Sequence, residues 1–340
     1  MTKTLKSLVG ATFVASLIAA APFSANAQEF TLKMQSSDSA GVPNFELEQD
    51  WAKRVGVMTG GRVEVEMLPV NSIVEHAETQ DAIAAGILDG HITDTSYFSG
   101  KDPAFGLIAN PVGAWSAPSE MLRFVEYGGG KELMNSLLNP RGLQFIGAVT
   151  PGLEAFVSSV PLDGVADLKG LKMRAPEGMV QQVFAAAGAS PVNIPQSEVF
   201  TSLDKKVIDA ADATVFSTNQ AMGLHDIAKH PVYPGFHSMP MLEVSVNKTK
   251  WDSMPADLQA ILEMSIRDLA HDMDARLAMK DMEAAARKDG GVTIHNWSAE
   301  ERAKFRQIAT SQWEKVAARS EDAQRVYDTL VKYLTAQGMI

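Results

Sequence analysis

One arginine in the middle of the chain stands where it could bind an anion. Residues 167–176 read DLKGLKMRAP, a pattern that predicts a turn, a short strand and a stop at Pro176. Arg174 is the last residue of that strand. A guanidinium at a strand end facing a cleft can hold a carboxylate through two parallel charge-assisted hydrogen bonds. An ordinary ion pair on the protein surface fits the same residue pattern.

Several kinds of catalytic chemistry find no support in the sequence. It contains no cysteine, which excludes a disulfide, a thiol nucleophile, a thiolate metal site and a lipid-anchored cysteine. It has no G-x-x-x-x-G-K-[ST] loop, no G-x-G-x-x-G after a strand and no G-x-S-x-G turn. The seven histidines never occur in H-E-x-x-H spacing. We therefore expect a binding protein and not an enzyme.

The net charge argues against nucleic acid as a partner. The formal charge is −11 at pH 7 and becomes −13 without residues 1–27, which carry two lysines and no acidic residue. A chain this acidic is repelled by phosphate backbones. A local arginine can still bind a small anion, so the net charge does not fix the sign of the ligand.

The first 27 residues are typical of a secretory signal peptide. Lys3 and Lys6 precede a mostly apolar stretch over 8–21, and Ala25-Asn26-Ala27 is an A-x-A cleavage pattern. The apolar stretch is short for a membrane span, which needs about 20 apolar residues. We expect a cleaved signal peptide, a mature start at Gln28 and a periplasmic location.

Periodicity along the remaining chain predicts two α/β units followed by helices. The alternating pattern at 30–34 and 63–67 predicts strands, and helical patterns follow each at 45–58 and 75–88. The middle of the chain repeats this pattern, with strands expected at 143–149, 154–160, 171–174 and 242–246 and a helix at 178–187. Residues 207–213 are expected to be a helix end that runs into a strand. The last part, 255–288 and 298–337, is long, charged and helical, with a brief strand pattern at 292–294. Ser298 and Glu301 have the spacing of a capping box.

Four motifs in order resemble the DctP family, the periplasmic receptors of TRAP transporters. They are DLKGLKMR at 167–174, GKDPAF at 100–105, YGGG at 127–130 and YPG at 233–235. The likeness covers nearly the whole mature chain, and it is greatest to the branch that binds 2-oxo and 2-hydroxy monocarboxylates. It implies an α/β, two-lobe periplasmic-binding-protein fold with mixed sheets, hinge strands and a long C-terminal helical region. The expected division is a signal peptide at 1–27, a first lobe at 28–150 with about 240–297, a second lobe at 151–239, and a helical segment at 298–340.

The resemblance also implies site residues. In that family the arginine at position 174 binds the substrate carboxylate, and the tyrosine at position 97 contacts the substrate through its hydroxyl. Asp212 matches an acidic residue that helps to bind a cation beside the carboxylate. This sequence departs from the pattern there, with Leu153 in place of glutamine and Ala213 in place of tryptophan. Asp212 bonding a hydroxyl or an ammonium directly is therefore the alternative to a metal ion.

Three further residues complete the expected site. Glu154 stands where many of these receptors have a second arginine, and a carboxylate there would disfavour a dianionic ligand; a solvent-facing Glu154 is the alternative. Phe236 and His237 follow the Pro234-Gly235 turn, where aromatic groups of the family wall the pocket.

The resemblance further implies partners and leaves rivals open. We expect a small carboxylate ligand, membrane subunits of a TRAP transporter, and no required cofactor; a metal cation beside the substrate and a homodimer remain open. Receptors for a sugar acid, a sulfonate or an aromatic acid, and a periplasmic sensor partner, share the fold. A periplasmic hydrolase is the rival of a different class.

The signal-peptide interpretation predicts the mass of the exported protein. Protein recovered from the periplasm should begin at Gln28 and carry no lipid, because cleavage follows the small residues at 25 and 27. Intact-mass spectrometry measures this directly. A mass that retains residues 1–27 would contradict the interpretation.

Overall fold

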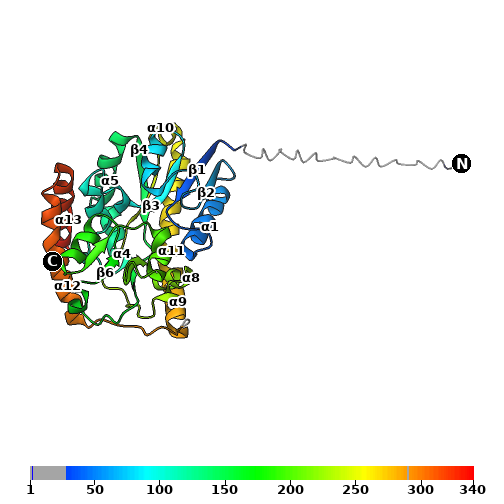
Figure 1. The fold of residues 1–340 in the computed structure, drawn as a ribbon. Coiled ribbons are helices and arrows are strands. Elements are labelled where there is room, and N and C mark those ends of the chain that lie inside the picture. The colour runs from blue at the N-terminus through cyan, green and yellow to red at the C-terminus, as the bar shows by residue number, and fades with distance from the viewer. Residues whose placement is uncertain (1, 3–27, 289–290) are drawn as a thin grey trace.

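The structure is a computed structural model that describes residue 2, residues 28–288 and residues 291–340 (Figure 1). The expected signal peptide, apart from Thr2, lies outside the described residues.

The first sheet has five strands in the order β2-β1-β3-β9-β4. β1 is parallel to both β2 and β3, whereas β9 is antiparallel to β3 and to β4, so the sheet is mixed. Its strands are β1 (Phe30–Ser36), β2 (Val63–Leu68), β3 (Gly90–Asp94), β4 (Leu143–Val149) and β9 (Leu242–Asn247).

The second sheet has four strands in the order β5-β8-β6-β7 and is also mixed. β6 runs parallel to β7 and β8, and β5 runs antiparallel to β8. Its strands are β5 (Ala155–Ser158), β6 (Lys172–Arg174), β7 (Ser190–Val192) and β8 (Ala210–Thr214).

The chain passes between the two sheets more than once. It leaves the first sheet after Val149, enters the second at Ala155, and returns to the first as β9 at Leu242. This arrangement agrees with the expected two-lobe fold with mixed sheets. The exact residue limits of the lobes stay a prediction.

Helices cover both sheets and form the C-terminal part. The shorter helices are α2 (Thr79–Ala84), α3 (Pro103–Ala109), α4 (Pro118–Tyr127), α5 (Gly130–Leu138), α6 (Met179–Ala186), α7 (Val199–Asp204), α8 (Phe216–Ala221), α9 (Leu224–Ile227) and α10 (Lys248–Ser253). The longer ones are α1 (Pro43–Met58), α11 (Ala256–Arg287), α12 (Ala299–Ala317) and α13 (Glu321–Ala336). Short 3₁₀ turns are η1 (His76–Glu78), η2 (Thr95–Phe98), η3 (Asn139–Arg141), η4 (Val165–Leu168) and η5 (Gln196–Glu198). α12 and α13 lie together along one side of the molecule (Figure 1).

The predicted patterns hold where one face is buried. In β2, Val63 is buried while Glu64 and Glu66 are exposed. In α1, Phe45, Trp51 and Val55 lie on one face and are buried. Met58 is the last residue of the helix, and 42% of it is exposed.

Three element predictions need correction. The helix expected at 75–88 is the turn η1 followed by the short α2, which ends at Ala84. The helix expected at 298–337 is two helices, because Ser320 begins a new one by accepting a hydrogen bond from the Ala323 amide. The strand pattern at 292–294 forms no strand; its neighbour His295 makes only an isolated bridge to Val232.

The expected capping box at the start of α12 is half present. The Ser298 hydroxyl accepts a hydrogen bond from the Glu301 amide, as predicted. The Glu301 carboxylate does not return to Ser298; it accepts from the Val165 amide of η4 and pairs with Lys304. Glu301 thereby links helix α12 to the turn η4.

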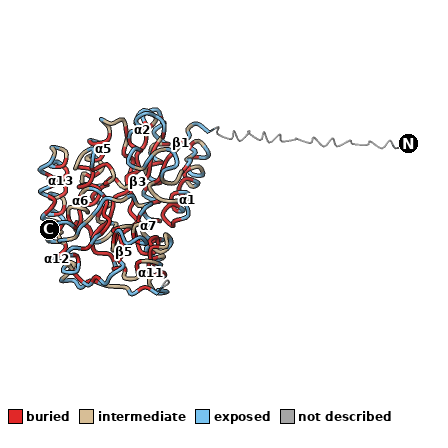
Figure 2. The backbone as a smooth tube through the Cα atoms, in the orientation of Figure 1, coloured by how far each residue is buried: buried red, intermediate tan, exposed pale blue. Residues whose placement is uncertain are grey.

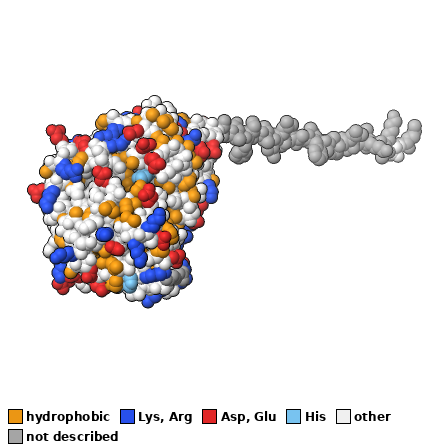
Figure 3. Space-filling view, in the orientation of Figure 1, with side chains coloured by type: hydrophobic (Ala, Val, Ile, Leu, Met, Phe, Trp, Pro, Cys, Tyr) orange, Lys and Arg blue, Asp and Glu red, His pale blue; other side chains and the backbone are white. Residues whose placement is uncertain are grey.

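Buried residues run through both sheets and under the C-terminal helices (Figure 2), and their apolar members form the core. Trp115, Met239, Met241 and Met273 lie in this core. Met279 and Met282 are more than half exposed on α11. The face drawn in Figure 3 carries acidic and basic side chains interspersed. Within the described residues, no helix is long and apolar enough to cross a membrane.

Candidate functional site

A cavity lies between residues of the two sheets. The space open to the centre of a water molecule is ≈ 60 Å³. Loops at the ends of β1 and β3 supply one wall, and residues of β6, β8 and the β4–β5 connection supply the other. The charged or ionisable residues of its lining are Asp38, His76, Asp94, Tyr97, Glu154, Arg174 and Asp212.

Arg174 is held in this cavity by backbone carbonyls of β8 and of the segment that follows β7. It ends β6, where it pairs with Val192 of β7 and Ala211 of β8. Only 2% of it is exposed. Its Nε donates to the Ile194 carbonyl at 2.9 Å, and its Nη1 donates to the Asp212 carbonyl at 2.7 Å. These two bonds fix the plane of the guanidinium.

The charge of Arg174 has no side-chain counterpart in ion-pair contact. Among the described residues, its recorded hydrogen bonds go to backbone carbonyls, and no carboxylate oxygen lies within 4.0 Å of it. A buried cation without an ion partner is costly, by several kcal/mol. Nη2, which makes neither of these bonds, is free to bind an anion that enters the cavity.

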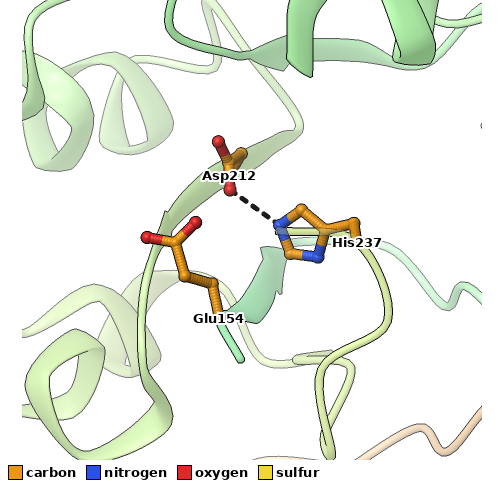
Figure 4. Close-up of side chains that lie close together, drawn as sticks. All are labelled: Glu154, Asp212 and His237. Carbon is orange, nitrogen blue, oxygen red and sulfur yellow. Dashed lines mark hydrogen bonds and ion pairs between the residues drawn. The ribbon is translucent and has the colours of Figure 1, made fainter. Parts of the chain in front are cut away.

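Asp212, His237 and Glu154 form a buried cluster beside the arginine (Figure 4). Asp212 lies on β8, Glu154 just before β5, and His237 in the segment that leads back to β9. His237 Nε2 and Asp212 Oδ1 are 2.7 Å apart, and Figure 4 shows the Glu154 carboxyl turned toward Asp212. The three residues are between 2% and 6% exposed.

The two carboxyl groups of this cluster differ in their affinity for protons. Burial, and then the nearby charge of Asp212, raise the pKa of Glu154 well above its usual value. Burial also acts to raise the pKa of Asp212, but the charge and hydrogen bond of His237 outweigh it and leave that pKa below its usual value. Glu154 therefore keeps its proton to a higher pH than Asp212 does.

The same cluster offers ligand atoms for a metal ion. One atom from each residue can be chosen so that all three lie within 4.8 Å of one another. Two carboxylate oxygens and an imidazole nitrogen suit several divalent cations. The Nδ1 atom of His237 has no hydrogen-bond partner among the described residues, whereas a metal-bound histidine usually donates through its second nitrogen. A cation can fit here, but the surroundings do not require one.

Gly235 allows the segment that leads back to β9 to pack against the backbone of Glu154. A side chain at Gly235 would place its Cβ 2.0 Å from the Glu154 carbonyl oxygen, so only glycine fits. Arg302 of α12 holds the same turn, donating from Nη1 to the Gly235 carbonyl and from Nη2 to the Pro234 carbonyl. Helix α12 thus helps to position His237 and Glu154.

Tyr97 lies in the cavity lining. It belongs to the 3₁₀ turn η2, which follows β3, and its ring packs edge-on against His76 at 4.5 Å between centroids. Burial raises the pKa of its hydroxyl above the usual value, so the group stays protonated and can donate a hydrogen bond.

A buried polar network supports the turn that carries Tyr97. Thr95 Oγ1 donates to Glu243 Oε2 at 2.9 Å, and Glu243 Oε1 lies 2.6 Å from His91 Nε2. His91 Nδ1 lies 2.9 Å from Thr79 Oγ1. The network joins β3, β9 and α2, so the start of η2 is fixed from three directions.

Phe236 and His237 were expected to line the cavity, and neither residue does. The Phe236 ring stacks on Trp297 at 3.8 Å and packs against Phe156 and Phe305, so it belongs to an aromatic core. His237 is buried, and it contacts the cavity lining through the carboxylate of Asp212. The structure brings Arg174, Tyr97, Glu154 and Asp212 together in the lining.

Two lining residues were missed in the sequence. Asp38 follows β1 and Asp94 ends β3, and these strands are parallel to each other. The carboxyl ends of parallel strands share one edge of a sheet, where ligands of α/β proteins commonly bind. This positional signal could have found both residues.

Burial leaves these two acids unusually prone to protonation. Burial raises the pKa of Asp38 to about 6, and also raises that of Asp94 to about 6. Behind Asp38, Glu48 is fully buried, and burial followed by the charge of Asp38 raises the pKa of Glu48 well above its usual value. The charge of Arg174 acts in the opposite direction on Asp94 and lowers its pKa, but burial has the larger effect.

These pKa values predict how stability depends on pH. A carboxyl with a higher pKa in the folded state holds more protons when folded, so the free energy of unfolding falls as pH rises from about 4 to about 6. Each group contributes roughly 1–3 kcal/mol to that fall. In the double variant Asp38→Asn/Asp94→Asn the fall should be smaller, measured by thermal denaturation of ligand-free protein from pH 4.5 to 7.5.

Asp204→Asn is the matched control, because Asp204 is exposed at the end of α7. It should keep the wild-type pH profile. Equal pH profiles for wild type and the double variant would show that the two carboxyls titrate normally.

Comparison with known proteins identifies the wider family. The model of "Bacterial extracellular solute-binding protein, family 7" (DctP) matches residues 35–320. A Nostoc protein named monocarboxylate 2-oxoacid-binding periplasmic protein is 26% identical over 310 residues, covering 86% of this chain and 85% of its own length.

Two solved structures are informative. A TRAP periplasmic solute-binding protein from Rhodobacter sphaeroides, in an apo open form, is 61% identical, with a TM-score of 0.75 over 91% of this chain and 99% of its own. One from Colwellia psychrerythraea, with bound calcium and pyruvate, is 27% identical, with a TM-score of 0.79 over 90% and 94%.

Proposed function

The chain belongs to the DctP family of bacterial extracellular solute-binding proteins, and from this we propose that it captures a small organic monocarboxylate of the 2-oxo or 2-hydroxy acid class in the periplasm for a TRAP transporter. Proteins of this family are receptors of transporters and not enzymes. The membrane subunits of the transporter would receive the ligand from the closed receptor.

The observation that carries this proposal is the buried guanidinium of Arg174. Its plane is fixed by two backbone carbonyls, it borders the cavity, and no carboxylate side chain is paired with it in the described part of the chain. A ligand carboxylate would supply the missing negative charge. Tyr97 and Glu154, while protonated, would then donate to oxygen atoms of the ligand, and Asp212 would accept from a ligand hydroxyl.

The size of the cavity supports a short acid. A space of ≈ 60 Å³ open to the centre of a water molecule favours a ligand of a few heavy atoms over a sugar acid or an aromatic acid. The Nostoc relative is named for 2-oxoacids, and the Colwellia structure holds pyruvate. Calcium in the latter supports a cation next to the substrate, for which Glu154, Asp212 and His237 are the candidate ligands here.

Binding would proceed by closure of the two lobes. The TM-score to the open apo structure, 0.75, is lower than the 0.79 to the pyruvate-bound structure, although the open structure is far more similar in sequence. A rotation between lobes lowers such a score without altering either lobe. This pattern, with the burial of Arg174, supports a closed form here and an open form that admits ligand.

Arg174→Lys tests the carboxylate contact. Lysine keeps the charge but loses the planar fork, so affinity for the best monocarboxylate should fall at least ~30-fold, about 2 kcal/mol, with the fold intact. Isothermal calorimetry measures the affinity, and circular dichroism checks the fold. Lys172→Arg, on the exposed side of the same strand, is the control and should bind as wild type does. A dissociation constant for Arg174→Lys within twofold of wild type would refute the contact.

The charge of the cavity predicts selectivity among acids. Succinate would bring a second carboxylate next to Glu154 and Asp212 with no matching cation, so the best monocarboxylate should bind at least ~100-fold more tightly, about 2.7 kcal/mol. A metal ion would narrow this gap, so competition is measured with and without chelator. Equal affinities in the presence of chelator would contradict a role for these two acids in the pocket.

A further inference from the structure

A second group of metal-ligating side chains lies away from the cavity of Arg174. Asp163 stands between β5 and η4, His230 follows α9, and His295 stands between α11 and α12. None of the three lines the cavity. Their side chains meet although they come from three distant segments of the chain.

Backbone hydrogen bonds hold the segments of the two histidines in place. The amide of His295 donates to the Pro231 carbonyl at 2.9 Å, and the amide of Tyr233 donates to the His295 carbonyl at 2.8 Å. The amide of His230 donates to the carbonyl of Ser158, the last residue of β5, at 2.8 Å. The chain itself therefore brings the two imidazole rings together.

The three side chains form a line from a carboxylate to a pair of imidazoles. Asp163 Oδ1 lies 2.7 Å from His295 Nδ1, and His295 Nε2 lies 3.1 Å from His230 Nδ1. An ionised carboxylate only accepts hydrogen bonds, so His295 donates to it from Nδ1. In a neutral ring the other nitrogen then carries the lone pair. His295 Nε2 thus directs a ligand atom toward His230 Nδ1.

The separation of these two nitrogens suits a shared metal ion. Zinc binds imidazole nitrogen at about 2.0–2.1 Å in tetrahedral geometry, which places two such nitrogens about 3.4 Å apart. The observed distance of 3.1 Å reaches this value with a small outward movement of the rings.

We propose that His230 Nδ1 and His295 Nε2 together bind a divalent transition-metal ion of the zinc type, and that Asp163 orients His295 for it. Imidazole nitrogen is a preferred ligand of zinc, copper and nickel. The ion would join the segment that leads back to β9 to the segment between α11 and α12. This inference does not depend on the carboxylate ligand proposed above.

The contact with Asp163 favours a metal ion here over one beside Arg174. A metal-bound histidine usually donates its second ring N–H to a carboxylate, a carbonyl or water, which fixes the tautomer. Asp163 supplies this acceptor to His295. The second nitrogen of His237, in the cluster with Glu154 and Asp212, has no such acceptor among the described residues. The pair of histidines is therefore the better prepared site for a transition metal.

The surroundings leave room for water to complete the coordination. The side chain of His295 is 11% exposed, and that of Asp163, which contacts the pair through His295, is 79% exposed. Two protein ligands leave two positions of a tetrahedral ion for water or another donor. Binding should therefore be reversible and weaker than at a closed site with four protein ligands.

Calorimetry and crystallography test the site. The full mature protein is freed of metal with EDTA, dialysed and titrated with zinc chloride at pH 7.5, with and without excess calcium. Calcium prefers oxygen ligands and should not compete for a pair of imidazoles. We expect one zinc ion per chain to bind at this pair in both buffers. Anomalous scattering from a zinc-soaked crystal should place that ion between the two rings.

Variants identify the ligands. His230→Gln and His295→Gln each remove one ligand and should weaken this zinc binding at least ~30-fold. Asp163→Asn should weaken it about 10-fold, because loss of an outer partner of a metal-bound histidine typically costs about 10–100-fold in affinity. His271→Gln, exposed on α11, is the matched control and should bind zinc as wild type does. Circular dichroism in EDTA checks that each variant folds.

Each outcome decides the inference. Zinc affinity within about twofold of wild type in both histidine variants, or an ion found at Glu154, Asp212 and His237 instead, would overturn it. Failure of the wild-type protein to bind zinc would show that the two rings share only a hydrogen bond. If a histidine variant does not fold, the anomalous signal of the wild-type crystal decides alone. None of these results bears on the carboxylate contact of Arg174, so the proposed function is tested separately.

Discussion

The structure of the site depends on one buried charge. Arg174 is removed from water and held by carbonyls of the second sheet, with no acidic side chain in ion-pair contact in the described chain. Such an arrangement is unfavourable in the empty protein, because carbonyl dipoles replace only part of the lost hydration. Proteins keep an uncompensated charge of this kind where a ligand completes it. The short β6, ended by Pro176, and the neighbouring β7 and β8 serve to hold that guanidinium in one orientation.

The rest of the fold positions the other residues that line the cavity with Arg174. The return of the chain as β9 inserts between β3 and β4, and the pairing of Glu243 with His91 and Thr95 fixes the turn that bears Tyr97. Arg302 of α12 binds the Pro234-Gly235 turn, and Gly235 lets that turn contact the Glu154 backbone. Residues far from the cavity therefore determine the position of the residues inside it.

The sequence correctly predicted elements with a simple hydrophobic period. It failed for residues whose surroundings depend on contacts between distant parts of the chain. Two-residue alternation found β2, and Arg174 was found because a turn and a proline bracket its strand. Phe236 was misplaced because a sequence does not tell whether an aromatic ring meets a ligand or, as here, Trp297. Asp38 and Asp94 were missed because each stands in an ordinary polar segment; their importance arises when β1 and β3 end at the same edge. Glu301 does not complete the predicted capping box, because its carboxylate accepts a hydrogen bond from the amide of Val165, which is distant in sequence.

The distribution of charge between the two walls gives a physical reason for closure to require ligand. Asp38 and Asp94 line the same cavity as Asp212, and burial raises the pKa of the first two to about 6. Carboxylates gathered in a cavity with little water repel one another, and that repulsion opposes an enclosed cavity without ligand. A ligand that pairs with Arg174 and also contacts the other lining residues would link residues of the two sheets. The free energy of binding is then used partly for closure, so a receptor built in this way distinguishes ligands by whether they reach both walls and not by their total charge.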